Sequence, residues 1–487
     1  MKLRIKMLKF SAGRPVAIIN DALALKASIH VDNRVLIKKG AKAVVAVVDV
    51  AKNFLEKDEV AVSSEIVRQL GLEEKDFVDM DIAVKPESVR LIHRKLDCHR
   101  LTKSELFEIM KDISRNALTE AEIAYFVSAV YKCGMSFDEI RNMTLAILET
   151  GKKLEIGGMV VDKHSIGGIP GRVTPLLVSI CSAAGLKMPK TSSRSITTPA
   201  GTADAMETIC KVDFTIPELK EIIKKTNACL VWGGSLNLAP ADDKIIQVER
   251  LINLDPEAQL LASILSKKLA VGAKYVLIDI PFGKNAKVNE KEAKILSNNF
   301  KKLAKSFKIH LDCFLEKAEE PLGDGIGPAL EIKDVIKVLK RESPCYKLEK
   351  KSIALSGKLL EMTKKAKKGQ GMKIANQILD SGEALEKFIQ IIEAQGGSLN
   401  NIKEARLSHD IHAEKTGKII EINIKKVNSL ARLLGCPADK ASGVYLYRHL
   451  NSGVKKGEKI LTLYAESETE LEEGIKFYNR NLPIIIK

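Results

Sequence analysis

A glycine-rich segment between residues 160 and 175 combines side chains and backbone groups that suit the binding of an anion. An apolar run leads into Lys-His-Ser at residues 163–165, and Ile-Gly-Gly-Ile-Pro-Gly follows before Thr174 and Pro175, which we expect to cap and begin a helix. Glycines let backbone N–H groups approach an anion, and the helix N-terminus adds positive potential. The segment is neither a Walker A motif nor a dinucleotide fingerprint, so a generic turn is the alternative. The adjacent charge and donors favour a phosphate site, and they come from Lys163, Ser165 and Arg172.

A second loop, residues 191–202, places seven hydroxyl side chains and Arg194 within twelve residues, ahead of another short helix. Hydroxyl residues also form turns, which is the structural alternative. A helix start preceded by serine, threonine, glycine and arginine repeats the arrangement of the first loop. We therefore expect two anion sites, or one site built from both loops.

Two further segments carry polar groups at the start of a helix and at the end of a strand. A predicted helix that follows Asp255 places Ser263 and Lys267 four residues apart on one face. A surface position for Lys267 is the alternative. The predicted strand 274–280 runs into a loop that ends in Lys287, another junction of strand and loop with cationic residues.

The hydrophobic pattern predicts a multidomain α/β and α+β protein. Three capping boxes, which begin at Thr102, Thr119 and Ser136, mark consecutive helices, and strand–loop–helix alternation indicates a mostly parallel sheet with sites at its carboxyl edge. Predicted strands of the first domain include 34–38, 43–50 and 59–63. The expected domains are an N-terminal β-rich domain (1–85), a helical domain (86–155, with 242–272 contributing), a central mostly parallel α/β phosphate-binding domain (156–400) and a C-terminal α+β domain (401–487).

The composition fits a folded protein with anionic partners. The 487 residues, 45% of them hydrophobic, can bury several cores, and the formal charge of +16 favours nucleic acid, an anionic membrane surface or phosphorylated small molecules. The longest apolar runs fall short of the about 20 residues that a transmembrane helix needs, and the N-terminus lacks a signal-peptide core, so we expect a cytoplasmic protein. The eight cysteines never form C-x-x-C, which indicates a reducing compartment and neither a disulfide scaffold nor a zinc ribbon.

Two other classes of function have weak support in the sequence. A nucleic-acid-binding protein would explain the charge, but aromatic residues make up only 5% and no helix-turn-helix, RNP or zinc-finger pattern occurs. His409 and His412 form H-x-x-H without a third ligand at a known spacing, so we predict no metal.

Four motifs together resemble the thymidine and pyrimidine-nucleoside phosphorylase family, over roughly residues 88–487. They are Lys-His-Ser-x-Gly-Gly from Lys163, a Ser-x-Arg loop followed by Gly-Thr at 201–202, Leu-Ala-Pro-Ala-Asp at 238–242, and Ala-Ser-Ile-Leu-x-Lys-Lys at 262–268. Arg172 replaces an acidic residue of the nucleoside enzymes, and hydroxyl residues replace their glycine-rich second loop. These departures and the extra N-terminal domain, which resembles a double-psi β-barrel, are similar to the nucleoside-monophosphate branch. Added positive charge suits a substrate with its own phosphate.

The resemblance implies a pentosyltransferase, that is, a glycosyltransferase that converts AMP and phosphate into adenine and ribose 1,5-bisphosphate in nucleotide salvage or degradation. It implies no cofactor, other nucleoside monophosphates as further substrates, no nucleic-acid or membrane partner, and a homodimer or larger homo-oligomer. A thymidine or pyrimidine nucleoside phosphorylase is the alternative. Relatives of anthranilate phosphoribosyltransferase share the architecture but use Mg²⁺-binding carboxylates, for which Asp242 and Asp243 are the best candidate pair.

The resemblance also implies a role for each candidate residue. Asp255 ranks first as general acid and His164 second, and an aspartic acid in that role needs a raised pKa. The expected phosphate-binding residues are Lys163, Ser165, Gly168, Arg172 and Ser192. The expected nucleotide-binding residues are Gly167, Ser193, Arg194, Ser195, Ile196, Thr197, Thr198, Thr202, Ser263, Lys267 and Lys287. We expect Arg172, Arg194 and Lys287 to create the potential that retains the 5′-phosphate.

Overall fold

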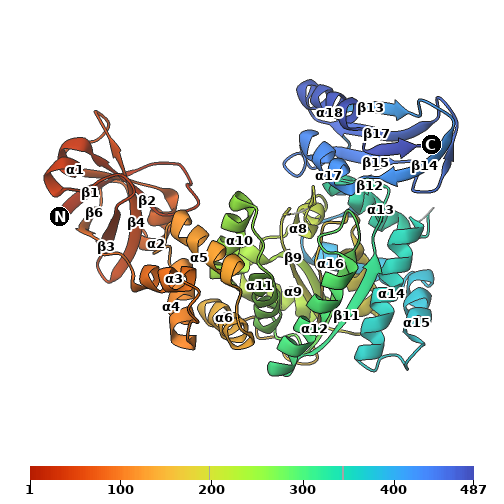
Figure 1. Cartoon of the computed structure of the whole chain (residues 1–487), viewed down its shortest axis with the longest axis horizontal. Helices are drawn as coiled ribbons and strands as arrows, with labels where there is room; N and C mark the ends of the chain where they lie inside the picture. Colours follow the sequence, from red (N-terminus) through yellow and green to blue (C-terminus); the bar gives the residue numbers. More distant parts are fainter. Residues whose placement is uncertain (197, 343–344) are drawn as a thin grey trace. The chain divides into compact units, whose positions relative to one another are not determined.

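The computed structural model describes residues 1–196, 198–342 and 345–487 of the chain (Figure 1). The predicted site residue Thr197 lies outside the described residues. The chain forms two compact units, which are described separately. The first contains residues 1–151 and 239–266, and the second contains residues 152–238 and 267–487.

The first unit begins with a closed barrel of six strands in the order β1-β5-β2-β4-β3-β6. The strands are β1 Lys2–Met7, β2 Val16–Asn20, β3 Arg34–Lys39, β4 Lys42–Ala51, β5 Glu59–Val62 and β6 Phe77–Ile82, with helices α1 Asp21–Ala27 and α2 Ser64–Leu70. Alternation fills the barrel, because Leu3 and Ile5 are buried while Lys2 is exposed and Arg4 is half-buried. The three strands predicted here are confirmed to within two residues at each end.

The rest of the first unit is a helical bundle. Its helices are α3 Glu87–Leu96, α4 Lys103–Ser114, α5 Glu120–Cys133, α6 Phe137–Thr150, α10 Pro240–Ile252 and the first part of α11 Glu257–Ala270. All three predicted capping boxes are present, at Thr102, Thr119 and Ser136, each with the glutamate three residues later. The apolar stripes of α4 and α5, which include Ile109 and Phe126, form the bundle core with residues of α10.

One pair of cysteines corrects the expectation that the thiols are all reduced. Cys98 and Cys133 form a disulfide with their Cα atoms 5.2 Å apart. Cys98 follows α3 and Cys133 ends α5, and the packing of these two helices brings the thiols together. The linear spacing of 35 residues contains no sign of this proximity. The free cysteines are Cys181, Cys210, Cys229, Cys313, Cys345 and Cys436.

The second unit is built around parallel strands, as predicted. Strands β7 Val161–Ser165, β10 Tyr275–Phe282 and β11 His310–Lys317 form a parallel sheet in the order β11-β10-β7, while β8 Met188–Ser192 and β9 Ala228–Trp232 form a separate parallel pair. A parallel bridge between Val160 and Lys187 connects the two groups. The predicted parallel sheet is therefore divided into a three-stranded sheet and a two-stranded one, because this bridge is the strand pairing that the described residues form between the β7 and β8 segments.

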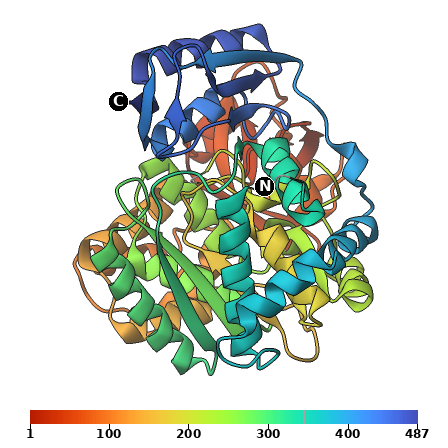
Figure 2. The same cartoon turned by 90° about the vertical axis from the view of Figure 1, so that its right-hand side faces the viewer.

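Helices cover both groups of strands. They are α7 Val173–Ala183, α8 Thr202–Met206, α9 Ile216–Thr226, α12 Glu290–Ser306, α13 Pro328–Lys340, α14 Tyr346–Met362, α15 Gly371–Asp380 and α16 Glu383–Ala394, with short 3₁₀ turns η1 Gly233–Leu236 and η2 Leu399–Asn401. Figure 2 shows the long strands β10 and β11 between α12 and α14, and both helices pack on them. Helix α7 is buried all round and contributes Leu176, Leu177 and Ile180 to the main core.

The start of α7 differs from the prediction. Arg172 is the N-cap and Val173 the first helical residue, so Thr174 and Pro175 lie inside the first turn instead of capping it. The first turn tolerates a proline here because its N–H groups have no partner within the helix. Helix α7 therefore begins two residues after Gly171, and its positive N-terminal end lies next to the glycine-rich loop.

The C-terminal part of the second unit contains two small antiparallel sheets. Strands β12 Gly325–Ile326, β15 Gly443–Leu446, β17 Lys459–Ala465 and β13 Leu407–His412 form one, and β16 Gly453–Val454, β14 Gly417–Ile422 and β18 Ile484–Ile486 form the other. Helices α17 Ile424–Leu433 and α18 Glu468–Asn481 complete an α+β arrangement, as predicted. Among the described residues of the whole chain, none of the helices has the length and apolar character to cross a membrane.

Candidate active site

The carboxyl ends of β7 and β10 bring a lysine, a serine and an aspartate together. The parallel register sets Ser165 opposite Asp279, and Ser165 Oγ donates a hydrogen bond of 2.9 Å to Asp279 Oδ2. Lys163 Nζ lies 3.8 Å from the same oxygen, which is an ion pair but too long for a hydrogen bond. Lys163 makes no side-chain hydrogen bond to any residue that the structure describes. Its ammonium is therefore buried with donors still to be satisfied.

Burial sets the protonation of Lys163. Burial lowers the pKa of this lysine to about 8, against the opposing effect of Asp279 and with a smaller lowering by Lys351 and Lys190. The ammonium is therefore charged at neutral pH but loses its proton in mildly alkaline solution. A dianion such as phosphate would supply the missing acceptors.

A second buried carboxylate lies next to Lys163 on β7. Asp162 is fully buried and accepts from Lys190 Nζ at 3.1 Å and from Lys268 Nζ at 2.6 Å. Burial alone would raise the pKa of Asp162, but the two lysines lower it overall. Burial lowers the pKa of Lys268 to about 7. Asp162 thus holds two cations from β8 and α11 beneath the glycine-rich loop.

His164 lies among these lysines. Burial lowers its pKa well below 6.5, and Lys268, Lys190 and Lys163 lower it further. The imidazole is therefore neutral at neutral pH, so it can donate one N–H hydrogen bond but cannot serve as a charged acid.

The glycine-rich loop needs the conformational freedom of glycine. Gly167, Gly168 and Gly171 have φ values of 88°, 91° and 121°. A Cβ atom at Gly171 would lie 2.7 Å from the Cβ of Leu322, so a larger residue would both strain the backbone and collide. Leu322 N donates to Pro170 O at 2.9 Å, which fixes the loop against the segment before α13.

Arg172 is engaged by partners within the protein. Its Nε donates to Glu331 of α13, which is completely buried, and Nη2 donates to Ala200 O at 2.8 Å. Longer contacts reach Thr198 Oγ1 at 3.4 Å and Thr202 Oγ1 at 3.3 Å. The side chain thus ties the glycine-rich loop to the hydroxyl-rich loop.

Arg194 is also engaged by carboxylates. Its Nη atoms donate to Glu207 at 2.7 and 2.8 Å and to Asp204 at 3.1 Å, and its guanidinium lies 4.8 Å from the ring centre of Trp232. The hydrogen bond from Arg194 and the other cations lower the pKa of Glu207 to about 2. The positive charge of Arg194, which was expected to face the ligand, is therefore largely compensated by carboxylates at α8.

Ser195 of the hydroxyl-rich loop is hydrogen-bonded within the protein, whereas the Ser192 hydroxyl is not bonded to any residue that the structure describes. Ser195 Oγ donates to Thr198 O at 2.6 Å, and Ser195 N donates to Asp204 Oδ2 at 2.6 Å. By contrast, Ser192 Oγ at the carboxyl end of β8 is buried and has no hydrogen-bond partner among the described residues. The Ser192 hydroxyl is thus a second buried donor without an acceptor in the described part of the chain. Ser193 is exposed, and Ile196 is half-buried.

Helix α17 contacts both loops, which sequence reasoning missed. Asn428 Nδ2 donates to Gly168 O at 3.3 Å, and Arg432 Nη2 donates to Ile196 O at 2.8 Å. Gly168 also lies near Lys287, since a Cβ at Gly168 would be 3.9 Å from Lys287 N. The structure thus brings Lys287, which is half-buried, to the glycine-rich loop.

The remaining predicted residues lie on or before α11. Ser263 Oγ donates to Asp242 Oδ2 at 2.7 Å, and Gln259 Nε2 donates to Asp242 Oδ1 at 3.0 Å. Asp255 is exposed two residues before the helix. Asp255 and Ser263 belong to the first unit, and Lys267 to the second, together with both loops.

Sequence reasoning missed four charged residues that organise the site, namely Asp162, Asp279, Glu331 and Lys351. One signal was available. Asp279 interrupts the apolar strand β10 and Asp162 directly follows two valines at the start of β7, and a carboxylate in a buried strand requires partners. Glu331 and Lys351 lie on helices whose burial only the packing reveals.

Among the residues that the structure describes, one group of side chains has the composition and spacing of a possible metal site. Ligand atoms of Asp324, Asp334 and Cys345 lie within 4.8 Å of one another. Hydrogen bonds within the protein already use several of these ligand atoms. Cys345 Sγ lies 3.1 Å from Asp324 Oδ2, and Gly325 N donates to Asp334 Oδ2 at 2.7 Å. Burial raises the pKa of Asp334 to about 7, as expected for a carboxyl that shares its environment with Asp324.

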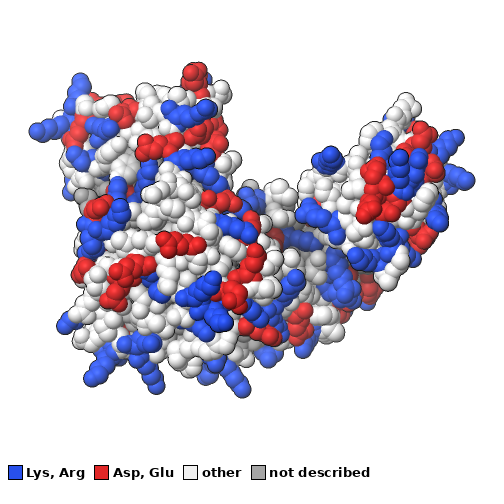
Figure 3. Space-filling model, turned by 180° about the vertical axis from the view of Figure 1, so that it is seen from behind, with Lys and Arg blue, Asp and Glu red and all other residues white. Residues whose placement is uncertain are grey.

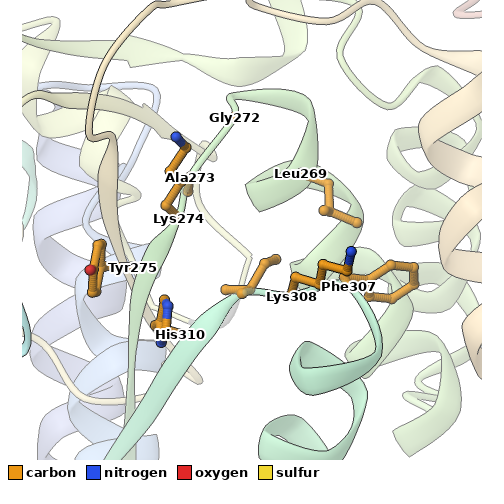
Figure 4. Close-up of a pocket in the computed structure, with 9 residues that line it drawn as sticks. Leu269, Gly272, Ala273, Lys274, Tyr275, Phe307, Lys308 and His310 are labelled. Atoms are coloured by element: carbon orange, nitrogen blue, oxygen red, sulfur yellow. The ribbon is translucent and has the colours of Figure 1, made fainter.

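A pocket of about 390 Å³ lies at the opposite end of the sheet (Figure 4). Its lining includes Lys274 and Tyr275 at the start of β10 and His310 at the start of β11, and the rings of Tyr275 and His310 stack with centres 5.0 Å apart. Substrate sites in parallel α/β sheets lie at the carboxyl ends of strands. The anion-binding groups and this pocket are therefore separate features.

Family models place the chain among the glycosyl-transferring enzymes. Residues 89–151 match the model of the helical bundle domain of the glycosyl transferase family, and residues 157–385 match its a/b domain. Residues 418–484 match the pyrimidine nucleoside phosphorylase C-terminal domain. The crystal structure of anthranilate phosphoribosyltransferase from Thermus thermophilus has the same fold over 63% of this chain and 99% of that one, with a TM-score of 0.52 and 17% identity.

Curated relatives are similar over nearly the whole chain. AMP phosphorylase of Thermococcus kodakarensis is 41% identical over 100% of this chain and 98% of its own length. AMP phosphorylase of Methanocaldococcus jannaschii is 40% identical over 97% and 95%, and AMP phosphorylase 1 of Archaeoglobus fulgidus is 38% identical over 98% and 96%. The chain therefore belongs to the AMP phosphorylase family.

Proposed function

We propose that this protein is a pentosyltransferase that converts AMP and inorganic phosphate into adenine and ribose 1,5-bisphosphate. The observation that carries the proposal is the pair of buried donors without hydrogen-bond acceptors among the described residues, Lys163 Nζ on β7 and Ser192 Oγ at the end of β8. Free phosphate provides acceptors for both. Membership of the AMP phosphorylase family supplies the identity of the second substrate.

The reaction displaces a base by phosphate. A phosphate oxygen forms a bond to C1′ while the bond between C1′ and the base nitrogen breaks, and the base leaves with a proton on adenine N7. Holding the nucleophile against C1′ and stabilising the charge supply most of the rate. Lys163, Ser192 and the amide of Gly168 donate to the attacking phosphate, and Ser165, whose hydroxyl donates to Asp279, lies beside it.

Asp255 is the better candidate for the proton donor. The neutral imidazole of His164 lies among lysines that oppose its protonation, which supports a role in hydrogen bonding and not as a charged acid. The resemblance in sequence is the support for Asp255.

The nucleotide is held by the remaining candidate residues. They are Gly167, the segment 193–198, Thr202, Ser263, Lys267 and Lys287. The contacts of Arg172 and Arg194 with Glu331 and Glu207 support a role in shaping the two loops. Lys287, whose backbone lies beside Gly168, is a further candidate for the 5′-phosphate.

The remaining parts of the proposal concern organisation. We assign domains to 1–85, 86–155 with 242–272, 156–400 and 401–487. The parallel pairs β1 with β5 and β2 with β4 support a double-psi arrangement of the barrel. We also propose a cytoplasmic homodimer or larger homo-oligomer that accepts other nucleoside monophosphates. On the face shown in Figure 3, lysine and arginine are interspersed with aspartate and glutamate, unlike the single basic stripe typical of nucleic-acid-binding proteins.

The test is to incubate the protein with AMP and measure adenine and ribose 1,5-bisphosphate. Release of adenine should require phosphate, or arsenate in its place, and adenosine should be a much poorer substrate. Full release in buffer without either anion would identify a hydrolase instead. A preference for thymidine or uridine over AMP would favour a nucleoside phosphorylase.

A further inference from the structure

Asp279 divides its two carboxylate oxygens between different partners. Oδ2 faces the phosphate loop, where it accepts from Ser165 Oγ at 2.9 Å and lies 3.8 Å from Lys163 Nζ. Oδ1 faces helix α14, where Lys351 Nζ lies 3.0 Å away in an ion pair that lacks the alignment of a hydrogen bond. All three charged side chains are 3% exposed.

Lys351 reaches Asp279 because α14 packs on β10. Its ammonium also lies 3.1 Å from Glu316 Oε2, at the end of β11. An aliphatic residue would be expected at a helix position that faces a sheet, as at Leu355 and Leu359 on the same helix. A lysine at such a position has to be explained by its charge.

The charge explains the long distance between Lys163 and Asp279. A buried carboxylate with one neighbouring ammonium would draw that ammonium into a direct hydrogen bond, because nothing else compensates it. A second ammonium on the other oxygen removes this requirement. Lys163 is thus held near Asp279 without donating a hydrogen bond to it, and the N–H groups of its ammonium remain able to bind phosphate.

We propose that Asp279 and Lys351 are a positioning pair for the attacking phosphate: Asp279 orients Ser165 and Lys163, and Lys351 balances Asp279 so that the Lys163 ammonium binds phosphate. The inference rests on the proposed function for the identity of the ligand. It assigns neither residue a contact with substrate.

The pair should control the pH at which phosphate binding is lost. Lys163 loses its proton at about pH 8, and phosphate affinity should fall above that pH. Asp279 favours the charged form of Lys163 and Lys351 opposes it. The other charged or titratable groups around Lys163 are Asp162 and His164 of β7, Lys190 of β8, Lys268 of α11 and Arg172 before α7.

Substitutions of Asp279 and of Lys351 should therefore shift the alkaline limb of the pH profile, that is, the pH above which phosphate affinity falls, in opposite directions. Asp279→Asn removes the anion and should move the limb to lower pH. Lys351→Met removes the opposing cation and leaves Lys163 as the partner of Asp279, so the limb should move to higher pH. Both variants should raise the KM for phosphate at pH 7 by about tenfold or more, the loss of roughly one charge-assisted contact, with a smaller change in kcat.

The experiment measures kcat and the phosphate KM between pH 6 and pH 9.5, and in parallel the binding of inorganic phosphate by calorimetry. The titration of phosphate itself is common to all variants and cancels in the comparison. Lys351→Arg keeps the charge and should restore the wild-type limb. Lys358→Met is the matched control, because Lys358 lies two turns along α14, is 41% exposed and pairs with Asp312 at 2.7 Å.

Opposite shifts, with rescue by Lys351→Arg and no shift in Lys358→Met, would support the inference. Shifts in the same direction, or an unchanged limb in Lys351→Met, would overturn it and leave the pair as structural residues only. If Asp279→Asn does not fold, Lys351→Met and Lys351→Arg decide the matter alone. A wild-type protein that binds phosphate but releases no adenine from AMP would refute the proposed function and leave the calorimetric comparison valid.

Discussion

Replacing Arg172 by methionine would separate two roles for this side chain. In the structure the guanidinium joins Glu331 of α13 to Ala200 O in the hydroxyl-rich loop, so its removal breaks a buried ion pair. Glu331 is completely buried, and its remaining donors are Gly171 N at 3.2 Å and Gly327 N at 3.3 Å. Breaking a buried pair from one side costs about 3–5 kcal/mol, and these two amides place the estimate at the lower end, about 3 kcal/mol.

The assay is thermal unfolding together with KM for AMP and for adenosine. A loss of about 3 kcal/mol should lower the midpoint by about 3 °C if the chain unfolds as one unit. The double variant Arg172→Met with Glu331→Gln should recover part of that loss, because the uncompensated carboxylate is gone. The affinity of the protein for AMP and for adenosine should fall by similar factors, since the variant weakens the hold on the hydroxyl-rich loop whichever substrate is bound.

The opposite pattern would refute the reasoning. Stability within about 0.5 kcal/mol of wild type, together with a loss for AMP far greater than for adenosine, would mean that Arg172 contacts the 5′-phosphate directly. The charge reversal Arg172→Asp should then act even more strongly on AMP, and high salt should reduce that difference.

Lys163→Ala should raise the phosphate KM about tenfold to a hundredfold, because a charge-assisted contact contributes about 1.5–3 kcal/mol, and an unchanged KM would locate the phosphate elsewhere. In wild type, the phosphate KM should rise as the pH passes about 8, since Lys163 is charged below that pKa and neutral above it. Asp255→Asn should lower kcat by about 10²- to 10⁴-fold with AMP binding retained, and the same loss in His164→Asn alone would exchange the two roles. Cys98→Ser should lower stability in non-reducing buffer by about 2–4 kcal/mol, and reductant should destabilise only the wild type; identical melting in every case would show that the bond to Cys133 contributes nothing.

Local patterns made several elements predictable. The capping boxes at Thr102, Thr119 and Ser136 depend on residues three apart, so they form wherever the chain is helical. The glycine-rich loop could be located because its backbone conformation requires glycine at Gly167 and Gly168. The start of α7 was misplaced, since both Arg172 and Thr174 can stand at a helix start and the contacts of Arg172 decide between them.

The anion site itself stays a prediction from the sequence. Lysine, serine and glycine next to a helix start are residue types that suit phosphate, and their order along the chain is visible without the fold. The sequence alone, however, overestimated the free positive charge. Arg172 and Arg194 were expected to face the nucleotide, but Glu331 and Glu207 compensate them within the protein.

The tertiary structure decided which charges pair and which remain available. Asp279 and Lys351 are 72 residues apart, Arg172 and Glu331 are 159 apart, and no local pattern connects them. Each pair exists because burial makes an isolated charge costly, and only packing determines which opposite charge is within reach. The residue types and spacing therefore predicted a phosphate site at the two loops, whereas the fold decided that Arg172 is paired with Glu331 while Lys163 lies 3.8 Å from Asp279 without a direct hydrogen bond to it.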